Sequence, residues 1–169
     1  MIRTNSSAVS TVLRNCFGVL GGFFISDDSS AKPLPKEPPV ERPKPIVLVI
    51  DDDEKYLETV RDLLAGTAFR VLTSSSGAKG LEIVRNCQDG LRLVLLDYSM
   101  PRLDGAETLR YVRKLNPHLK VIGLTDVDVE SLPASFREGV QKVVTKPVSG
   151  ADLIAIISQF ASDRSIQPT

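Results

Sequence analysis

The sequence predicts an α/β fold in which helices cover both faces of one parallel sheet, a doubly wound arrangement. Apolar runs of strand length alternate along the chain with segments that have helical periodicity. Residues 46–50 and 93–96, the most apolar of these runs, are hydrophobic at every position. Runs of this kind are typical of parallel strands that are buried on both faces. The alternation therefore favours five strand–helix units packed into one sandwich.

Five segments have the composition and length of β-strands. Residues 46–50 are dominated by β-branched side chains, and residues 93–96 and 121–124 form similar apolar runs. Two weaker strands are expected over residues 69–73 and 142–145. Together these segments supply five strands for the sheet.

Three helices are expected in the first three connections, because apolar residues recur there at helical spacing. Their stripes are Leu57, Val60, Leu63 and Leu64; Leu81, Ile83, Val84 and Cys87; and Leu109, Val112 and Leu115. Gly66 and Gly90 follow the first two stripes, and Pro117 follows the third. Glycine and proline are common just beyond the last turn of a helix, so these residues mark the helix ends.

The last two helices are expected near the carboxyl end of the domain. The fourth is predicted over residues 132–138, with Pro133 in its first turn, where a missing N–H group is tolerated. The fifth is predicted over residues 153–160. Ser149 and Asp152 stand before it with the spacing of a capping box, in which the side chains bond free N–H groups at the helix start.

The composition indicates a soluble globular domain without a strongly charged partner. Of the 169 residues, 42% are hydrophobic and 25% are charged, and 21 basic side chains balance 21 acidic ones. This balance provides no global field for nucleic acid, so no nucleic-acid binding is expected. Cys16 and Cys87 are too few for a disulfide framework or a metal site, and a reducing, cytoplasmic location is therefore expected.

Both ends of the chain differ from the domain, which is expected over residues 46–162. Residues 1–26 have an apolar core that is shorter than the roughly 20 residues needed to span a bilayer. We expect a disordered leader there; the alternative is an amphipathic helix over residues 9–24 that docks on a membrane surface or in a partner's groove. The proline-rich residues 27–45 are expected to form an extended linker, and residues 163–169 a disordered tail.

Charged and hydroxyl side chains directly follow four of the predicted strands. Residues 51–53, all aspartates, follow the first strand, Asp97 the third, Thr125 the fourth and Lys146 the fifth. In an open parallel sheet these strand ends meet at one edge, where ligands bind. Clustered carboxylates repel one another unless a cation neutralises them, and oxygen ligands suit Mg²⁺. The pattern predicts magnesium-assisted phosphoryl transfer to a carboxylate.

Four segments together resemble the response regulator receiver family. They read VLVIDDD, LVLLDYSMPRLDG, VIGLTD and VTKPV, in the family's order and near its spacing, and the resemblance covers residues 46–160. It implies a flavodoxin-like fold whose five parallel strands lie in the order 2-1-3-4-5 and are covered by five helices. It also implies a phosphoacceptor switch in a two-component or phosphorelay signalling system.

The resemblance implies a role for each residue at the sheet edge. Asp97 would be the phosphorylated aspartate, Thr125 would bond a phosphoryl oxygen, and Lys146 would pair with the phosphoryl charge. The implied Mg²⁺ ligands are Asp51 (through water), Asp52, Asp97 and the backbone carbonyl of Ser99. The peptide bond between Lys146 and Pro147 would be cis, as it is in the family.

The implied function is signalling, with no enzymatic activity beyond self-catalysed phosphoryl transfer to Asp97 and autodephosphorylation. A sensor histidine kinase or a histidine phosphotransfer protein would donate the phosphoryl group. A downstream protein target would then read a changed surface around the fourth helix, the fifth strand and the fifth helix.

Two positions depart from the family's pattern. The residue after Thr125 is usually small, whereas here it is Asp126, whose carboxylate would repel a phosphoryl group if it pointed into the site. The aromatic residue usually found three positions before Lys146 is replaced by Val143, which has no ring to swing inward. We therefore expect an intact phosphorylation site with an altered readout.

Two further functions stay open as alternatives. In the first, the chain is a pseudo-receiver, a binding module that never carries phosphate because Asp126 blocks the site. In the second, it is a hydrolase with an aspartate nucleophile, as in haloacid-dehalogenase-type phosphatases. That chemistry needs a second acid two residues after the nucleophile, where this chain has Ser99, so the hydrolase ranks last.

Two polar residues near these motifs are expected to have structural roles only. Asp53 is expected to cap the first helix, and His118 is expected to be a solvated surface residue.

Overall fold

The computed structural model describes residues 43–162. The leader over residues 1–26, the linker up to residue 42 and the tail over residues 163–169 lie outside the described residues, so these expectations stay untested. Within residues 43–162, no helix is both long enough and apolar enough to cross a membrane.

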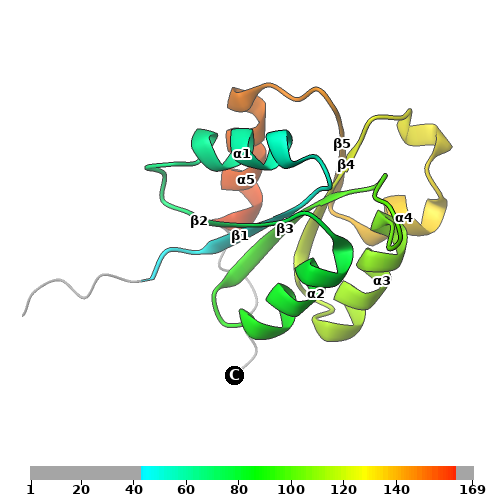
Figure 1. The fold of residues 1–169 in the computed structure, drawn as a ribbon, viewed down its shortest axis with the longest axis horizontal. Helices are drawn as coiled ribbons and strands as arrows, with labels where there is room; N and C mark the ends of the chain where they lie inside the picture. Colours follow the sequence, from blue (N-terminus) through cyan, green and yellow to red (C-terminus); the bar gives the residue numbers. More distant parts are fainter. Residues whose placement is uncertain (1–42, 163–169) are drawn as a thin grey trace, which may run out of the picture. The chain divides into compact units, whose positions relative to one another are not determined.

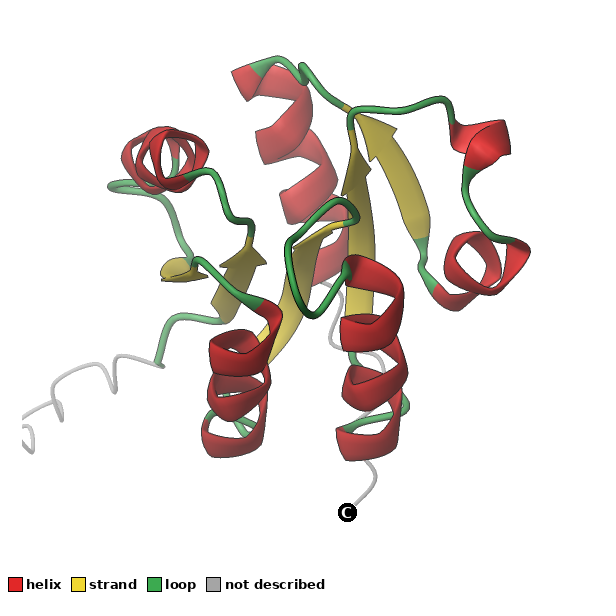
Figure 2. Ribbon diagram, turned by 45° about the vertical axis from the view of Figure 1, so that its right-hand side comes forward, coloured by secondary structure: helices red, strands yellow, loops and turns green. Residues whose placement is uncertain are grey.

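Five parallel strands form one sheet in the order β2-β1-β3-β4-β5, which confirms the expected topology (Figure 1). The strands are β1 Ile46–Ile50, β2 Arg70–Ser74, β3 Leu91–Asp97, β4 Lys120–Thr125 and β5 Lys142–Thr145. Since all pairs are parallel, the carboxyl ends of the strands lie at the same edge, as the arrowheads in Figure 2 show. The chain reverses its direction of strand addition at β1, so β1 and β3 are neighbours at the centre of the sheet.

Helices cover both faces of this sheet, with α1 and α5 on one side and α2, α3 and α4 on the other (Figure 1). Their bounds are α1 Glu54–Leu63, α2 Gly77–Asn86, α3 Gly105–Leu115, α4 Ala134–Gly139 and α5 Gly150–Ala161, with a short 3₁₀ helix at Val129–Ser131 before α4. The fold is thus the doubly wound α/β sandwich that the sequence predicts.

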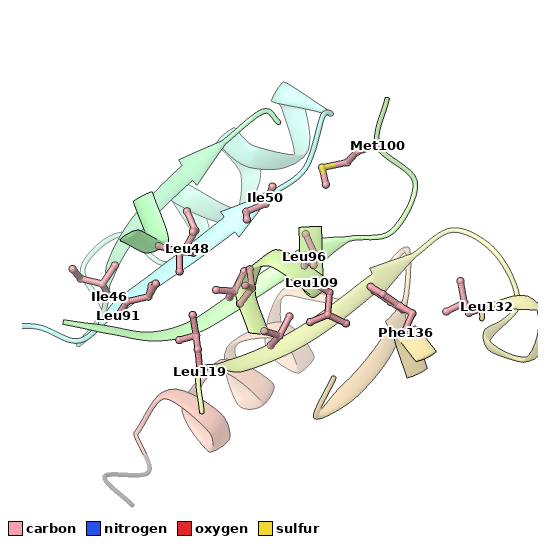
Figure 3. Close-up of a cluster of buried hydrophobic side chains, with 14 residues drawn as sticks. Ile46, Leu48, Ile50, Leu91, Leu96, Met100, Leu109, Leu119, Leu132 and Phe136 are labelled. Atoms are coloured by element: carbon pink, nitrogen blue, oxygen red, sulfur yellow. The ribbon is translucent and has the colours of Figure 1, made fainter. Parts of the chain in front are cut away.

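Two hydrophobic clusters, one on each face, hold the layers together. Alternate side chains of β1 and β3 point to opposite faces, so Leu48 and Val94 belong to one cluster and Val49 and Leu95 to the other. Figure 3 shows the first cluster, in which Phe136 of α4 lies near Leu109 of α3. Because every residue of β1 is buried, its apolar run is explained by burial on both faces.

Two predicted helix starts have the expected side-chain caps. Asp53 accepts hydrogen bonds from the N–H groups of Lys55 and Tyr56 at the start of α1. Ser149 accepts one from the N–H of Asp152 at the start of α5, 3.1 Å away. These caps satisfy N–H groups that have no partner within the helix, and they fix where α1 leaves the site.

The strand bounds differ from the prediction by at most two residues, and the last two helices begin elsewhere than predicted. The fourth helix begins at Ala134, and Pro133 is its N-cap residue; Leu132 before it is extended. The predicted start at Leu132 was wrong, because a residue that precedes proline disfavours helical geometry. The fifth helix starts at Gly150, three residues earlier than its apolar stripe suggested, because its cap is Ser149.

Candidate functional site

The predicted acidic cluster forms at the carboxyl edge of the sheet. Asp51 follows β1 and Asp97 ends β3, and their side chains are 1% and 2% exposed. Asp52, the next residue after Asp51, is exposed. One carboxylate oxygen from each of these three residues lies within 4.8 Å of the others. The topology therefore brings together three carboxylates that are up to 46 positions apart in the sequence.

Lys146 connects the two buried carboxylates. Its Nζ donates a hydrogen bond of 2.6 Å to Asp51 Oδ2 and one of 2.7 Å to Asp97 Oδ1. Burial alone would lower the pKa of Lys146, but these two bonds and the negative charges behind them outweigh it, so the pKa is raised. The ammonium group is charged at any physiological pH and partly neutralises the cluster. Three carboxylates against one ammonium leave a negative site that can attract a divalent cation.

The remaining oxygens of the buried carboxylates are held by backbone N–H groups. Asp97 Oδ2 accepts from the N–H of Ser99 at 2.9 Å, and Asp51 Oδ1 accepts from the N–H of Asp53 at 2.9 Å. Burial raises the pKa of Asp97, while its bonds to Lys146 and Ser99 act in the opposite direction. The carboxylate is therefore held in a fixed orientation at a place where its charge is only partly compensated.

Thr125 ends β4 and is fully buried. Its hydroxyl accepts a hydrogen bond from the N–H of Val127 at 3.1 Å and lies 3.3 Å from the carbonyl of the same residue. The backbone carbonyl of Thr125 accepts from the N–H of Lys146 at 2.7 Å, which ties the end of β4 to the start of the loop that follows β5. The peptide bond between Lys146 and Pro147 is cis, as expected.

The two positions that depart from the family's pattern lie in different environments. Asp126 is exposed, and the N-cap position of the following 3₁₀ helix is held by Asp128. Asp126 therefore does not cap the 3₁₀ helix, and its exposed carboxylate is close enough to the site for its charge to act on the Tyr56 phenol. Val143 is half-buried and packs against the cluster that contains Phe136. His118 is exposed, as expected.

Sequence reasoning missed Tyr56, which lies in the first turn of α1. Its ring is 4.7 Å from Lys146 Nζ, centroid to nitrogen, within the range of a cation–π contact. Burial raises the pKa of the Tyr56 phenol to about 12, against the effect of the Lys146 charge. The sequence signal that could have identified Tyr56 was its position. It is an aromatic residue three positions after the last of the three aspartates, and it directly precedes Leu57, where the apolar stripe begins.

The acidic cluster has the donor set that Mg²⁺ prefers. All three side chains offer carboxylate oxygens, and Mg²⁺ is commonly held by one or two carboxylates with water and phosphate oxygens in its other positions. The residues present therefore fit this ion.

The receiver domain family of response regulators matches residues 47–158 of the chain. The chain belongs to the response regulator receiver family. Receiver domains are signalling modules of two-component systems that work with histidine kinases or phosphotransfer proteins. A crystal structure of a response regulator receiver domain protein from Clostridium thermocellum is 34% identical and has a TM-score of 0.64. It covers 70% of this chain, and this chain covers 94% of it.

Curated relatives of this receiver differ widely in length. Two-component response regulator ORR3 of Oryza sativa subsp. japonica is 30% identical over 118 residues, which are 68% of this chain and 88% of the relative. Transcription factor SKN7 of Candida albicans is 27% identical over 163 residues, 96% of this chain but 28% of the relative. Transcriptional regulatory protein ZraR of Escherichia coli is 32% identical over 114 residues, 67% of this chain but 25% of the relative. The chain thus spans only about a quarter of the two transcriptional proteins.

Proposed function

We propose that this receiver is a phosphoacceptor switch that is phosphorylated on Asp97 with the help of Mg²⁺. The observation that carries the proposal is the setting of Asp97. Its carboxylate is buried at the end of β3, both its oxygens are held by hydrogen bonds, and it lies in an acidic cluster that fits Mg²⁺. We assign the domain to residues 46–162, slightly longer at both ends than the matched residues 47–158.

The proposed transfer uses a carboxylate oxygen of Asp97 as the nucleophile. This oxygen attacks phosphorus, an O–P bond forms, and the bond from phosphorus to the imidazole nitrogen of a phosphohistidine donor breaks with its electron pair going to nitrogen. Mg²⁺, held by Asp51, Asp52, Asp97 and the backbone carbonyl of Ser99, would supply neutralisation of the developing negative charge.

Two further residues would serve the phosphoryl group after transfer. Lys146 already lies 2.7 Å from Asp97 Oδ1, so a small movement of its ammonium group would pair it with a phosphoryl oxygen. The Thr125 hydroxyl, now bonded to the Val127 backbone, would turn to donate to another phosphoryl oxygen. Because that rotation would break the bonds to Val127, phosphorylation would change the β4–α4 loop.

The proposed partners are proteins. A sensor histidine kinase or a histidine phosphotransfer protein would donate the phosphoryl group, and a downstream protein target would read the phosphorylated state. We place this exchange in the cytoplasm, where such donors meet receivers. The transcriptional roles of the longer relatives stay with those proteins, since this chain spans only about a quarter of each.

Intact-protein mass spectrometry tests the proposal. The full chain is incubated with acetyl phosphate and Mg²⁺, and the expected result is a mass increase of one phosphoryl group. The adduct should be labile to hydroxylamine, because an acyl phosphate is attacked by this nucleophile while a serine or threonine phosphate ester is stable. Asp97→Asn should abolish the increase, and omission of Mg²⁺ should strongly slow it.

Binding of a beryllium fluoride adduct separates the proposal from the pseudo-receiver alternative. A receiver that accepts phosphate should also bind this phosphoryl mimic at Asp97, with Mg²⁺ present. The exposed position of Asp126 does not favour a blocked site. A wild-type chain that takes up neither phosphate nor beryllium fluoride would contradict the proposal and support the pseudo-receiver.

A further inference from the structure

Tyr56 faces the cluster of charges from α1, a position that the proposed transfer step does not use. Its ring lies under the Lys146 ammonium group at 4.7 Å. Its hydroxyl oxygen is buried and has no hydrogen-bond partner among the residues that the structure describes. The charges of Lys146, Asp51, Asp97 and Asp126 all act on the phenol. The ring thus contacts the cation that bridges Asp51 and Asp97, and the hydroxyl is buried beside these charges.

We propose that Tyr56 is a positioning residue of the phosphoacceptor site, whose ring holds the Lys146 ammonium beside Asp97 and whose hydroxyl donates a hydrogen bond to the incoming phosphoryl group or its water. This inference rests on the proposed function, because it assigns Tyr56 to the same site.

The Tyr56 ring is a partner of Lys146 that does not also serve as a proposed metal ligand. In the absence of ligands, Lys146 is held by Asp51 and Asp97, the same carboxylates that are the proposed Mg²⁺ ligands. A bound ion would weaken both of these contacts, because it would compete with the ammonium for the negative charge of the carboxylates. The face of the Tyr56 ring is uncharged, attracts cations through its quadrupole and does not compete for the metal. It therefore keeps Lys146 near Asp97 when the phosphoryl group arrives.

The Tyr56 hydroxyl is a hydrogen-bond donor that has no acceptor among the described residues. A buried hydroxyl without a hydrogen bond is unfavourable, so a ligand that supplies an acceptor gains from this residue. A phosphoryl group offers several acceptor oxygens. A tyrosine phenol is protonated at physiological pH, and burial raises the pKa of the Tyr56 phenol further, so the group is available as a donor. Only one element, α1, has to place it, and the Asp53 cap bonds the Tyr56 N–H directly.

Two substitutions separate the contributions of the ring and the hydroxyl. Tyr56→Phe retains the ring and removes the hydroxyl; Tyr56→Leu removes both. Tyr111 offers matched controls, because its ring also contacts cations, Arg110 and Lys114, but on the exposed face of α3. The controls are Tyr111→Phe and Tyr111→Leu. Thermal melts of all variants show whether each one folds.

The first measurement is the rate of labelling of the full chain by acetyl phosphate at fixed Mg²⁺. We expect Tyr56→Leu to be slower by about tenfold and Tyr56→Phe by about threefold, in line with the strengths of a cation–π contact and a single hydrogen bond. Both Tyr111 controls should label at the wild-type rate.

The second measurement needs no phosphorylation. Protons that lie over an aromatic face are shielded, so the NMR signal of the Lys146 ammonium group should be displaced in the wild type and in Tyr56→Phe. In Tyr56→Leu it should move toward the position of an ordinary lysine. A structural role of Tyr56 elsewhere in α1 would not produce this pattern.

The outcomes separate this inference from the proposed function. A wild-type chain that labels, with Tyr56→Leu labelling equally fast or with an unshifted Lys146 signal, overturns the inference and leaves the proposed function standing. A wild-type chain that never labels, although the Lys146 signal is displaced as expected, overturns the proposed function and the inference with it.

Discussion

At the scale of single residues, Lys146 determines the electrostatics of the site. Three clustered carboxylates were expected to repel one another until a metal ion arrived. In the structure, Lys146 bridges Asp51 and Asp97 with bonds of 2.6 and 2.7 Å, so part of the repulsion is already neutralised. The pKa of Asp97 is nevertheless raised, first of all by burial. The ionised Asp97 therefore still opposes folding when no ligand is bound.

Asp97→Asn should raise the stability of the metal-free chain at neutral pH. A carboxyl whose pKa is raised in the folded state destabilises that state when it is ionised, and the loss develops as pH rises from the ordinary aspartate pKa to the raised one. Asparagine stays neutral and retains an acceptor oxygen for Lys146 or Ser99. The gain in the free energy of unfolding from Asp97→Asn should thus be complete at pH values above this window and absent at pH values below it.

Denaturant melts in a metal chelator, at neutral and acidic pH, measure this difference. Asp89→Asn, at an exposed aspartate outside the site, is the control and should change stability little at either pH. If the free energy of unfolding of Asp97→Asn is clearly below that of the wild type at neutral pH, the ion pair with Lys146 matters more than the burial of charge.

Asp126→Ala should change the rate of phosphorylation by less than about twofold at physiological salt. The Asp126 side chain is exposed, and water and ions screen the repulsion between an exposed carboxylate and a phosphoryl group. Labelling rates with acetyl phosphate, at low and physiological salt, check this expectation. A large acceleration at both salt concentrations would show that the carboxylate turns into the site and would revive the pseudo-receiver alternative.

At the scale of elements, the start of α3 packs closely against the end of β3. Asp104 caps this helix through the N–H of Glu107, and Gly105 is its first residue. A side chain at Gly105 would lie 2.7 Å from the Cα of Tyr98 and closer still to the backbone oxygen of Asp97. Glycine is required there because backbone, which cannot move aside cheaply, occupies the space.

Gly105→Ala should destabilise the domain by about 1–3 kcal/mol, the usual range for overpacking, and should slow labelling of Asp97. Gly150→Ala is a matched control, because Gly150 is likewise the first residue of a capped helix. Its new methyl group would meet the far end of the Leu63 side chain at 2.9 Å, which can rotate away. Urea melts of both variants should show the larger loss for Gly105; equal losses would contradict the packing argument.

At the scale of the whole molecule, Mg²⁺ should act as a stabilising ligand of the folded state. An ion that binds only the folded chain adds about 2.7 kcal/mol to the free energy of unfolding at one hundred times its Kd. Thermal melts with Mg²⁺ and with a chelator measure this increment, which Asp52→Ala should largely remove.

The neighbouring aspartate provides the control for this experiment. Asp53 caps α1, so Asp53→Ala should lower stability by about 0.5–2 kcal/mol with or without the ion and retain the Mg²⁺ increment. If Asp53→Ala loses the increment while Asp52→Ala retains it, the assignment of metal ligand and cap has to be exchanged.

The sequence by itself determined the class of fold and the edge at which the site lies. A run such as Ile46–Ile50, apolar at every position, is compatible with a covered parallel strand, and residues that end parallel strands must share an edge. The helix caps at Asp53 and Ser149 were also predictable, since capping depends on neighbours within a few positions.

Only the tertiary structure decided which groups touch. That Lys146 bonds both Asp51 and Asp97, and rests on the ring of Tyr56, depends on side-chain directions at the ends of three strands and one helix. The exposure of the Asp126 side chain likewise depends on the tertiary structure around the end of β4. Sequence patterns report the burial and spacing of a residue along its own element, whereas these contacts join elements that are up to 95 residues apart.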